Sequence, residues 1–206
     1  MVLSQLRPAL VLFLLLSLLT GIVYPLGMTA LSGLILPDRA AGSLVYDRGR
    51  VIGSSLIGQD FASPRYFHGR PSATMGPDPR DSSKTVATPY NAAASLASNA
   101  GPTSKALLDR VTATTNVLKL ENPEAMARGW RIPVELVMTS ASGLDPDLSP
   151  EGALFQVLRV ARARGLDEER IRHLVLTSIR QPLLGFLGEP HVNVLALNRA
   201  LDRLAQ

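Results

Sequence analysis

The first forty residues carry a long apolar run, and its length indicates how this part of the chain folds. No charged side chain occurs between Arg7 and Asp38, and residues 9–19, ALVLFLLLSLL, are apolar except for one serine. About 20 apolar residues suffice to cross the roughly 30 Å hydrocarbon core of a bilayer. The pattern therefore predicts a membrane-spanning helix near residues 8–31, and Pro25, which removes a backbone hydrogen bond, predicts a bend near Tyr24-Pro25.

A cleaved signal peptide is the alternative interpretation of this run, because one arginine followed by a Leu-rich stretch fits both. The uncharged run is longer than the ~7–15 residues of a signal peptide's apolar h-region, and ALS at 30–32 is its nearest approach to a cleavage site. We therefore expect a short cytoplasmic tail at residues 1–7, the helix and its exit at 8–36, and a soluble domain at 37–206.

Basic residues flank both ends of the expected membrane helix. Arg7 precedes it, and three arginines follow within twenty residues: Arg39, Arg48 and Arg50. This count disagrees with an N-terminus in the cytoplasm. It is weak evidence, since large domains cross the membrane largely regardless of charge.

From residue 38 onward the pattern is that of a mixed α/β domain. Short apolar runs on either side of Asp47-Arg48-Gly49 predict a β-hairpin within residues 42–61. Residues 63–102 are rich in Ser, Thr, Gly, Pro and Asn, which predicts a long loop of the kind that is commonly functional or disordered. The apolar segment IPVELVMT, residues 132–139, predicts a buried strand.

Capping signals and, for the last of them, an amphipathic pattern predict four helices in the same domain. One is expected from a cap at Thr103 or Ser104 to about Leu118. Ser149-Pro150-Glu151 combines a hydroxyl N-cap, a proline at the first helical position and an acid in the first turn, so a second helix should begin there and end at Gly165. The remaining two are expected at residues 167–179 and 195–204.

The second of these helices has one apolar face. Four residues share it, and two arginines are expected off it: Leu154, Val157, Leu158 and Ala161 on the face, Arg159 and Arg162 outside it. Six arginines and three acids lie between residues 159 and 180. A phosphate-binding surface is one interpretation of this charge, and a solvated helix face is the one we favour.

Composition excludes several classes of chemistry. The 21 basic and 17 acidic residues are mixed along the chain, and a formal charge of +4 is too small to indicate a nucleic-acid partner. The chain has no cysteine, which excludes disulfides, zinc–thiolate sites and thiol nucleophiles. Its three histidines show no ligand spacing, and neither G-x-x-x-x-G-K-[ST] nor G-x-G-x-x-G occurs, so we expect no metal site and no autonomous nucleotide site.

A membrane-tethered hydrolase is an alternative function that we keep open. It would pair Ser140 or Ser142 with His68 and Asp145. The segment SASG is no nucleophile elbow, however, and Ser142-Gly143 followed by Asp145-Pro146 is typical of a turn.

The stretch YFHGRPSAT, residues 66–74, carries the densest group of functional side chains. Its aromatic rings can bury apolar area, and Arg70 offers a planar guanidinium with several hydrogen-bond donors. Pro71 keeps the backbone of Arg70 out of the α-helical region. Such residues are typical of structural anchors and of protein interfaces. Six of them are candidates for structural anchoring or docking: Tyr66, Phe67, His68, Gly69, Arg70 and Pro71.

Segments along nearly the whole chain resemble the KdpC family, the C subunits of the Kdp potassium-transporting ATPase. They occur in the family's order: LTGIVYPLG (19–27), GSSLIGQDF (53–61), YFHGRPSAT (66–74), PYNAAASLASNAGPTSKAL (89–107), SASGLDPDLSPEGALFQVLRVARARGL (140–166) and LGEPHVNVLALNRALD (187–202). One departure is that Leu96 and Ala97 stand where the family commonly has glycine. If those glycines need positive φ, both residues would be strained.

The resemblance implies an accessory, non-catalytic subunit of a high-affinity, ATP-driven potassium importer in a prokaryotic plasma membrane. The implied partners are a channel-like potassium-binding subunit, a P-type ATPase subunit, a very small hydrophobic subunit and membrane lipid. The family has a single membrane helix with a cytoplasmic N-terminus and an extracytoplasmic mixed α/β domain. This implied orientation outweighs the weak charge count.

The resemblance also implies a role in assembly and as a catalytic chaperone that raises the ATP affinity of the pump. Gln156, in ALFQ, matches a glutamine proposed to contact nucleotide. A domain outside the membrane cannot reach ATP on the cytoplasmic side, so we expect ATP to act through the complex, with no cofactor bound by this chain alone. A remote effect requires different interactions with two conformations of the pump.

Overall fold

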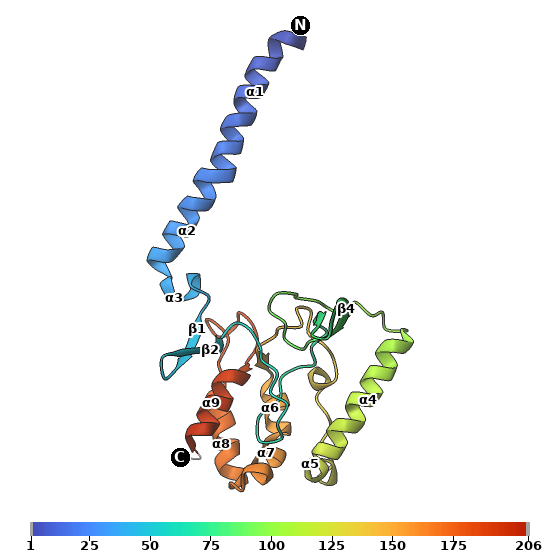
Figure 1. The fold of residues 1–206 in the computed structure, drawn as a ribbon. Coiled ribbons are helices and arrows are strands. Elements are labelled where there is room, and N and C mark those ends of the chain that lie inside the picture. The colour runs from blue at the N-terminus through green and yellow to red at the C-terminus, as the bar shows by residue number, and fades with distance from the viewer. Residues whose placement is uncertain (1, 205–206) are drawn as a thin grey trace. The chain divides into compact units, whose positions relative to one another are not determined.

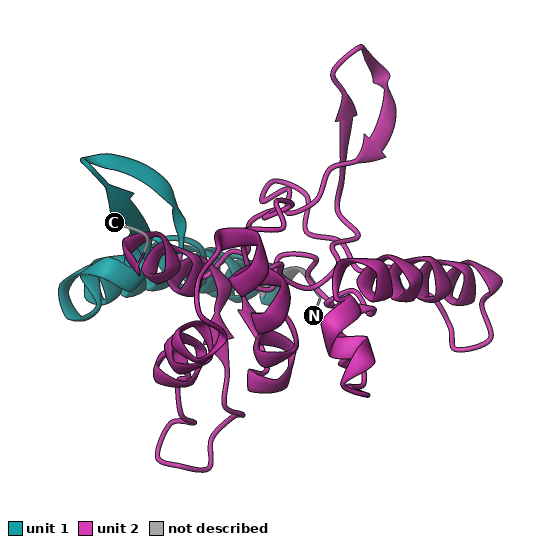
Figure 2. Cartoon of the chain, turned by 90° about the horizontal axis from the view of Figure 1, so that it is seen from below, with its two compact units in different colours: residues 1–54 teal, residues 55–206 magenta. Residues whose placement is uncertain are grey.

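The structure is a computed structural model that describes residues 2–204. The chain divides into two compact units, residues 1–54 and residues 55–206, which Figure 2 colours separately. Each unit is described by itself below. Helices and strands both occur, as the sequence predicts for a mixed α/β chain with one apolar N-terminal helix.

The first unit begins with a long apolar helix (Figure 1). It consists of α1 (Val2–Leu18), a π-helical turn (Leu19–Val23) and α2 (Tyr24–Ile35) without a break. Residues 5–35 of this helix are long and apolar enough to cross a membrane. The Tyr24 N–H donates to the Leu19 carbonyl, which widens the turn directly before Pro25, the residue with no N–H to donate. The structure thus has a π-helical turn beside this proline, and the bend near Tyr24-Pro25 stays a prediction.

The first unit ends in a small hairpin. A short helix, α3 (Pro37–Ala40), leads to β1 (Leu44–Asp47) and β2 (Arg50–Ser54), which pair antiparallel. Arg48 has φ 45° and Gly49 has φ 78°, and two successive positive φ values are the mark of a type I′ hairpin turn. The predicted hairpin is confirmed, with its turn at the expected residues.

The second unit contains a hairpin that the sequence did not predict. Strands β3 (Met75–Asp78) and β4 (Asp81–Ala87) pair antiparallel inside the segment expected to be a long loop, so that prediction is wrong for these residues. An Asp78 side-chain oxygen accepts from the Arg80 N–H at 2.8 Å and fixes the turn that joins the strands. The strands are rich in small polar residues, and the alternating apolar residues that mark a strand are therefore missing.

The helices of the second unit follow the predicted order (Figure 1). The described elements are α4 (Lys105–Glu121), α5 (Pro123–Ala127), a 3₁₀ turn (Val134–Leu136), β5 (Asp147–Leu148), α6 (Pro150–Phe155), α7 (Val157–Arg164), α8 (Glu168–Ser178), β6 (Val192–Asn193) and α9 (Val194–Leu204). Strands β5 and β6 pair antiparallel.

The capping predictions are confirmed, with two refinements. Ser104 is the N-cap of α4, which continues to Glu121. The Ser149 hydroxyl accepts from the Gly152 N–H at 3.0 Å, and Gly165 ends α7 with φ 65°. The expected single helix between these two residues is interrupted at Gln156, which separates α6 from α7.

The strand predicted at residues 132–139 is wrong. Residues Val134–Leu136 form a 3₁₀ turn in this segment, and Pro133 has no N–H for a strand ladder. The Glu135 carboxylate accepts from the Ser149 N–H at 3.0 Å and from the Ser149 hydroxyl at 2.6 Å. The segment is apolar because Leu136 and Val137 are buried, and its polar residue holds the start of α6.

The core of the second unit lies among α6, α7, α8 and α9. Side chains with no exposed surface come from each of these helices and from the loop before β3: Phe67, Ala153, Val157, Val160, Ile171, Val175, Leu197 and Leu201. Phe67 is thus a core residue on a segment that is neither helix nor strand. That loop, residues 63–72, is called the 63–72 loop below.

Candidate functional site

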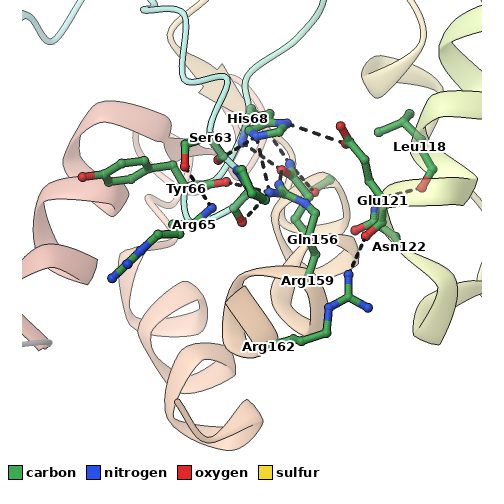
Figure 3. Close-up of polar contacts among 12 residues, drawn as sticks. Ser63, Arg65, Tyr66, His68, Leu118, Glu121, Asn122, Gln156, Arg159 and Arg162 are labelled. Atoms are coloured by element: carbon green, nitrogen blue, oxygen red, sulfur yellow. Dashed lines mark hydrogen bonds and ion pairs between the residues drawn. The ribbon is translucent and has the colours of Figure 1, made fainter. Parts of the chain in front are cut away.

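The 63–72 loop is held by side chains from the helices it packs on, and Figure 3 shows the middle of this network. Gln156, at the junction of α6 and α7, is 1% exposed. Its Oε1 accepts from the His68 N–H at 2.8 Å and from Arg159 Nη2 at 2.6 Å. Its Nε2 donates to the His68 carbonyl at 3.0 Å and to the Gly152 carbonyl at 3.2 Å. A side-chain amide offers two donors and two acceptor positions, so Gln156 is fully hydrogen-bonded within the chain.

Asn198, on α9, binds the neighbouring residue of the loop in the same way. Its Oδ1 accepts from the Phe67 N–H at 2.9 Å, and its Nδ2 donates to the Phe67 carbonyl at 2.9 Å. Two amides from different helices therefore satisfy the backbones of two consecutive loop residues, as a neighbouring strand would. We call Gln156, Arg159 and Asn198 the clamp.

Arg159 is the charged member of the clamp and is 1% exposed. Its Nη1 donates to the Pro64 carbonyl at 2.7 Å and to the Tyr66 carbonyl at 3.1 Å. Burial lowers the pKa of Arg159 to about 10, against the opposing effect of Glu121. The prediction that Arg159 lies off the buried face of its helix is wrong, because loop carbonyls compensate its charge inside the protein.

His68 points into the same network (Figure 3). Its Nε2 lies 3.0 Å from the Ser63 carbonyl and 3.3 Å from Arg159 Nη1, while its Nδ1 lies 3.9 Å from the Glu121 carboxylate on α4. Burial, and then the charge of Arg159, lower the pKa of His68, and the Ser63 carbonyl, Glu121 and Asp60 oppose that shift. The imidazole therefore favours the neutral form more than a histidine in water.

Tyr66 fixes the outer side of the loop. Its hydroxyl donates to the Asp202 carboxylate at 3.1 Å, and the Arg164 guanidinium lies over its ring, 4.8 Å from the ring centre. Arg164 also pairs with Asp202 at 2.8 Å. The ring is thus held between α7 and α9.

The second half of the loop is tied to the turn before β5. Arg70 Nη1 lies 3.0 Å from the Asp145 carboxylate, and the Tyr90 hydroxyl donates to the Arg70 carbonyl at 2.6 Å. A Cβ at Gly69 would overlap that hydroxyl, so this position requires glycine. Burial, and then Asp145, raise the pKa of Tyr90, so its phenol keeps the proton that it donates. The Ser72 hydroxyl donates to the Gly143 carbonyl at 2.7 Å, one residue beyond Pro71.

A hollow of about 340 Å³ lies between the 63–72 loop and α4. Its lining is mixed: apolar side chains such as Phe61, Val117, Leu118 and Leu136 contribute together with acidic, basic and other polar ones: Asp60, His68, Arg70, Tyr90, Glu121 and Gln156. Within the described part of the chain, no cluster of three or more His, Asp or Glu side chains could hold a metal ion.

The hydrolase alternative is not supported by this geometry. Ser140 is buried and accepts from the Gly143 N–H at 2.9 Å, while Ser142 accepts from the Leu144 N–H at 3.1 Å. Asp145 pairs with Arg70, and the His68 ring contacts Ser63, Arg159 and Glu121. Within residues 2–204 the four proposed residues therefore form no nucleophile–base pair.

The arginines between residues 159 and 180 are mostly engaged within the chain. Arg162 pairs with Glu124, Arg164 with Asp202, and Arg172 with Glu168 at 3.3 Å. Arg170 donates to the Leu204 carbonyl at 3.3 Å. The contacts of Arg162, Arg164 and Arg170 bind α7 and α8 to neighbouring segments, and the Arg172–Glu168 pair lies within α8, which explains the charge of this stretch without a phosphate ligand.

The substitution of the two family glycines causes no strain. Positive φ among the described non-glycine residues occurs at Ser43, Arg48, Tyr90, Asn99 and Leu184, and neither Leu96 nor Ala97 is among them. The Leu96 N–H donates to the Ser142 carbonyl at 3.0 Å. The left-handed residue of this loop is Asn99, a residue type that tolerates the conformation.

Sequence reasoning found the loop but missed most of its partners. Tyr90 and Asn198 lie in segments that resemble the family, but nothing in those segments indicated a contact with the loop, and the bonds of the clamp to His68 and Phe67 span 88 and 131 residues of chain. Of the six loop candidates, the structure joins His68 to Gln156 by direct hydrogen bonds, whereas Phe67 is bound by Asn198. The contact of Gln156 with nucleotide stays a prediction, and it would require the amide to exchange one of its present partners.

Comparison with known proteins places these residues in a family. A family model described as "KdpC: K+-transporting ATPase, c chain" matches residues 6–203. A protein of Rhodopseudomonas palustris (strain BisB18), named Potassium-transporting ATPase KdpC subunit, is 63% identical over 97% of this chain and 98% of its own. Proteins of the same name from Bradyrhizobium diazoefficiens and Methylobacterium nodulans are 59% and 60% identical, each over 98% of both chains.

Proposed function

Because the chain belongs to the KdpC family of K⁺-transporting ATPase subunits, we propose that it is an accessory subunit that stabilises the assembled pump and has no catalytic site of its own. Its partners are the channel-like potassium-binding subunit, the P-type ATPase subunit and the small hydrophobic subunit. The apolar helix at residues 5–35 anchors it in the plasma membrane, with the N-terminus in the cytoplasm and the domain at residues 37–206 outside.

The observation that carries this proposal is that the side-chain amide of Gln156 already makes all the hydrogen bonds it can, so it is not free to form a catalytic or nucleotide site. Its four hydrogen bonds all go to groups of the same chain, and the side chain is 1% exposed. An ATP contact would break at least one of these bonds and leave a buried group of the loop or of Arg159 without a partner, which costs about 1–3 kcal/mol. Gln156 therefore acts as a structural member of the clamp.

The effect on ATP affinity then has to be remote. An outside domain changes the affinity of a cytoplasmic site only if it interacts differently with two conformations of the pump. The clamp contributes by keeping the 63–72 loop in one conformation, so that the surface presented to the partner subunits is the same in every complex. No cofactor is bound by this chain alone, and ATP is bound by the complex.

Two matched variants test this role in the purified complex. Gln156→Ala and Asn198→Ala each remove a side-chain amide that binds the loop backbone, and only the first alters the residue that resembles a nucleotide contact. We expect both variants to reduce recovery of the partner subunits and to change the KM for ATP in parallel. A raised KM confined to Gln156→Ala, with full recovery of the partners, would refute the structural role.

A second measurement tests the orientation. In intact cells an added protease should cut residues 55–206, and in inverted vesicles it should leave them intact. Calorimetric titration of the full chain in detergent should show no heat at millimolar ATP. Cleavage restricted to inverted vesicles would reverse the topology and reopen direct contact with ATP.

A further inference from the structure

The segment between α8 and β6 exposes the densest group of large apolar side chains in the second unit. Leu183, Leu184, Phe186 and Leu187 are 70%, 76%, 72% and 52% exposed. The other large apolar side chains exposed on this unit are scattered: Leu56, Leu96, Leu108, Val117, Leu120, Val134 and Leu176. Isolated exposed apolar residues are ordinary, whereas four among five consecutive residues mark an interaction site. We call residues 183–187 the apolar tip.

The apolar tip is held in shape by its own backbone. Leu183 and Leu187 exchange hydrogen bonds in both directions, at 3.2 Å and 2.9 Å, and the Gly185 N–H donates to the Pro182 carbonyl at 3.0 Å. A second bridge joins Arg180 to His191 at the base, at 2.8 Å and 3.1 Å. The side chains are therefore presented by a defined turn, and little conformational freedom would be lost on binding.

Leu184, at the end of the tip, has a backbone conformation that is unfavourable for leucine. Leu184 has φ 55° and Gly185 has φ 81°, and a leucine in the left-handed region costs roughly 1 kcal/mol. The hairpin of the first unit has the same two positive φ values at Arg48 and Gly49, and there the first position is charged. The backbone conformation does not require an apolar residue, so the choice of leucine serves something other than folding.

We propose that the apolar tip inserts into a concave, uncharged pocket of another subunit of the ATPase complex and anchors this chain there. The inference rests on the proposed function, because a subunit of the complex supplies the pocket. Exposed leucines and a phenylalanine on a rigid turn match such a pocket by shape and by burial of apolar area.

Two other occupants fit the tip less well. A standard interface between two proteins buries about 800 Å² per partner and involves about 20–30 residues a side, so four side chains are too few to join two copies of this chain. In the ATPase complex four side chains can suffice, because the apolar N-terminal helix of this chain provides a second attachment. Segments that enter a membrane interface carry Lys or Arg with Trp or Tyr, and residues 181–190 contain none of these.

The test uses the full chain, tagged and co-expressed with the other subunits of the K⁺-transporting ATPase. Leu184→Asn removes the apolar end and places there a residue that tolerates positive φ. Phe186→Ser removes a second side chain at a position without positive φ. Arg48→Asn, at the matched turn of the first unit, is the control. The measurement is the ratio of partner subunits to tagged chain after solubilisation in detergent and dilution.

We expect each tip variant to lower this ratio about tenfold, the effect of losing one central apolar contact, and the control to leave it unchanged. The thermal unfolding midpoint should be unchanged by Phe186→Ser and unchanged or higher for Leu184→Asn. Full recovery of partners with both tip variants would overturn the inference and favour lipid as the occupant. A fall in the unfolding midpoint that matches the loss of partners would overturn it too. If the wild-type chain recovers no partner, the proposed function itself fails.

Discussion

The 63–72 loop and the apolar tip are both irregular segments of the second unit, and their order has opposite origins. The loop has no backbone ladder, and Gln156, Arg159 and Asn198 hold it from distant helices with its Phe67 side chain in the core. The tip is held by hydrogen bonds between neighbours in sequence and keeps its apolar side chains in solvent. Polar groups that face inward serve the fold of this chain, and apolar groups that face outward are available to another chain.

Among the variants that compare the loop with the tip, Arg159→Ala should reduce the free energy of unfolding most. Arg159→Ala leaves the Pro64 and Tyr66 carbonyls without their side-chain donor and removes one of the two donors to Gln156 Oε1, which keeps the His68 N–H. We expect the free energy of unfolding to fall by about 3 kcal/mol, because buried carbonyls lose their donor and the missing side chain leaves a cavity; urea denaturation of the full chain in detergent measures it.

Arg170→Ala is the matched control, since this arginine is exposed and donates a single long hydrogen bond to the Leu204 carbonyl. Its effect should stay within about 0.5 kcal/mol. A loss below about 1 kcal/mol for Arg159→Ala would show that the clamp does not order the loop.

One glycine in each region allows the same comparison with a smaller expected effect on stability. A Cβ at Gly69 would overlap the Tyr90 hydroxyl, so Gly69→Ala should cost about 2 kcal/mol by overpacking. Gly185 has open space around it and φ 81°, so Gly185→Ala should cost about 1 kcal/mol through its backbone alone. Both values come from the unfolding free energy of the full chain.

A double-mutant cycle distinguishes the two causes. Tyr90→Phe removes the colliding hydroxyl and should recover part of the Gly69→Ala loss, with a coupling of about 1 kcal/mol. When Tyr90→Phe is combined with Gly185→Ala, the loss in unfolding free energy should equal the sum of the two separate losses. Equal coupling for both glycines would contradict the distinction between the loop and the tip.

The sequence predicted the parts of this fold that depend on neighbours in the chain. Ser149-Pro150, Gly165 and Arg48-Gly49 act within a few residues, and the helices and the first hairpin begin or end where those signals lie. Residues 132–139 misled the prediction because Leu136 and Val137 are buried by packing, whereas Pro133 and the bonds of Glu135 decide the local conformation. The hairpin β3–β4 carried no apolar alternation.

The candidate site shows the same limit. The residues of YFHGRPSAT suggested an anchored loop, but the sequence could not reveal that Asn198 and Gln156 bind consecutive residues from two helices. The burial of Arg159 was missed for the same reason, because helical periodicity describes one helix and cannot show which carbonyls face it. The exposed apolar tip also depended on the structure, since apolar residues in a sequence are expected to be buried.

The pH dependence of the 63–72 loop provides the smallest and most specific test. The pKa of His68 is lowered in the folded chain by burial and by Arg159, while Glu121, Asp60 and the Ser63 carbonyl oppose the shift. The unfolded chain therefore binds the His68 proton at higher pH than the folded chain, so stability is complete above the ordinary histidine pKa of about 6.5 and falls as the pH drops below it. The loss cannot exceed about 1.4 kcal/mol per pH unit and ends below the lowered folded pKa.

His68→Gln should remove that part of the pH dependence, because glutamine has no proton to bind in this range. The measurement is the unfolding free energy of both full chains in detergent between pH 5 and pH 8, with the variant subtracted so that titrating carboxylates cancel. We expect the difference between the chains to change below about pH 6.5 and to be constant above it. A constant difference over the whole range would mean that His68 is as free to take a proton in the folded chain as in the unfolded one. The clamp would then leave the imidazole open to water, as the side chains of the apolar tip are.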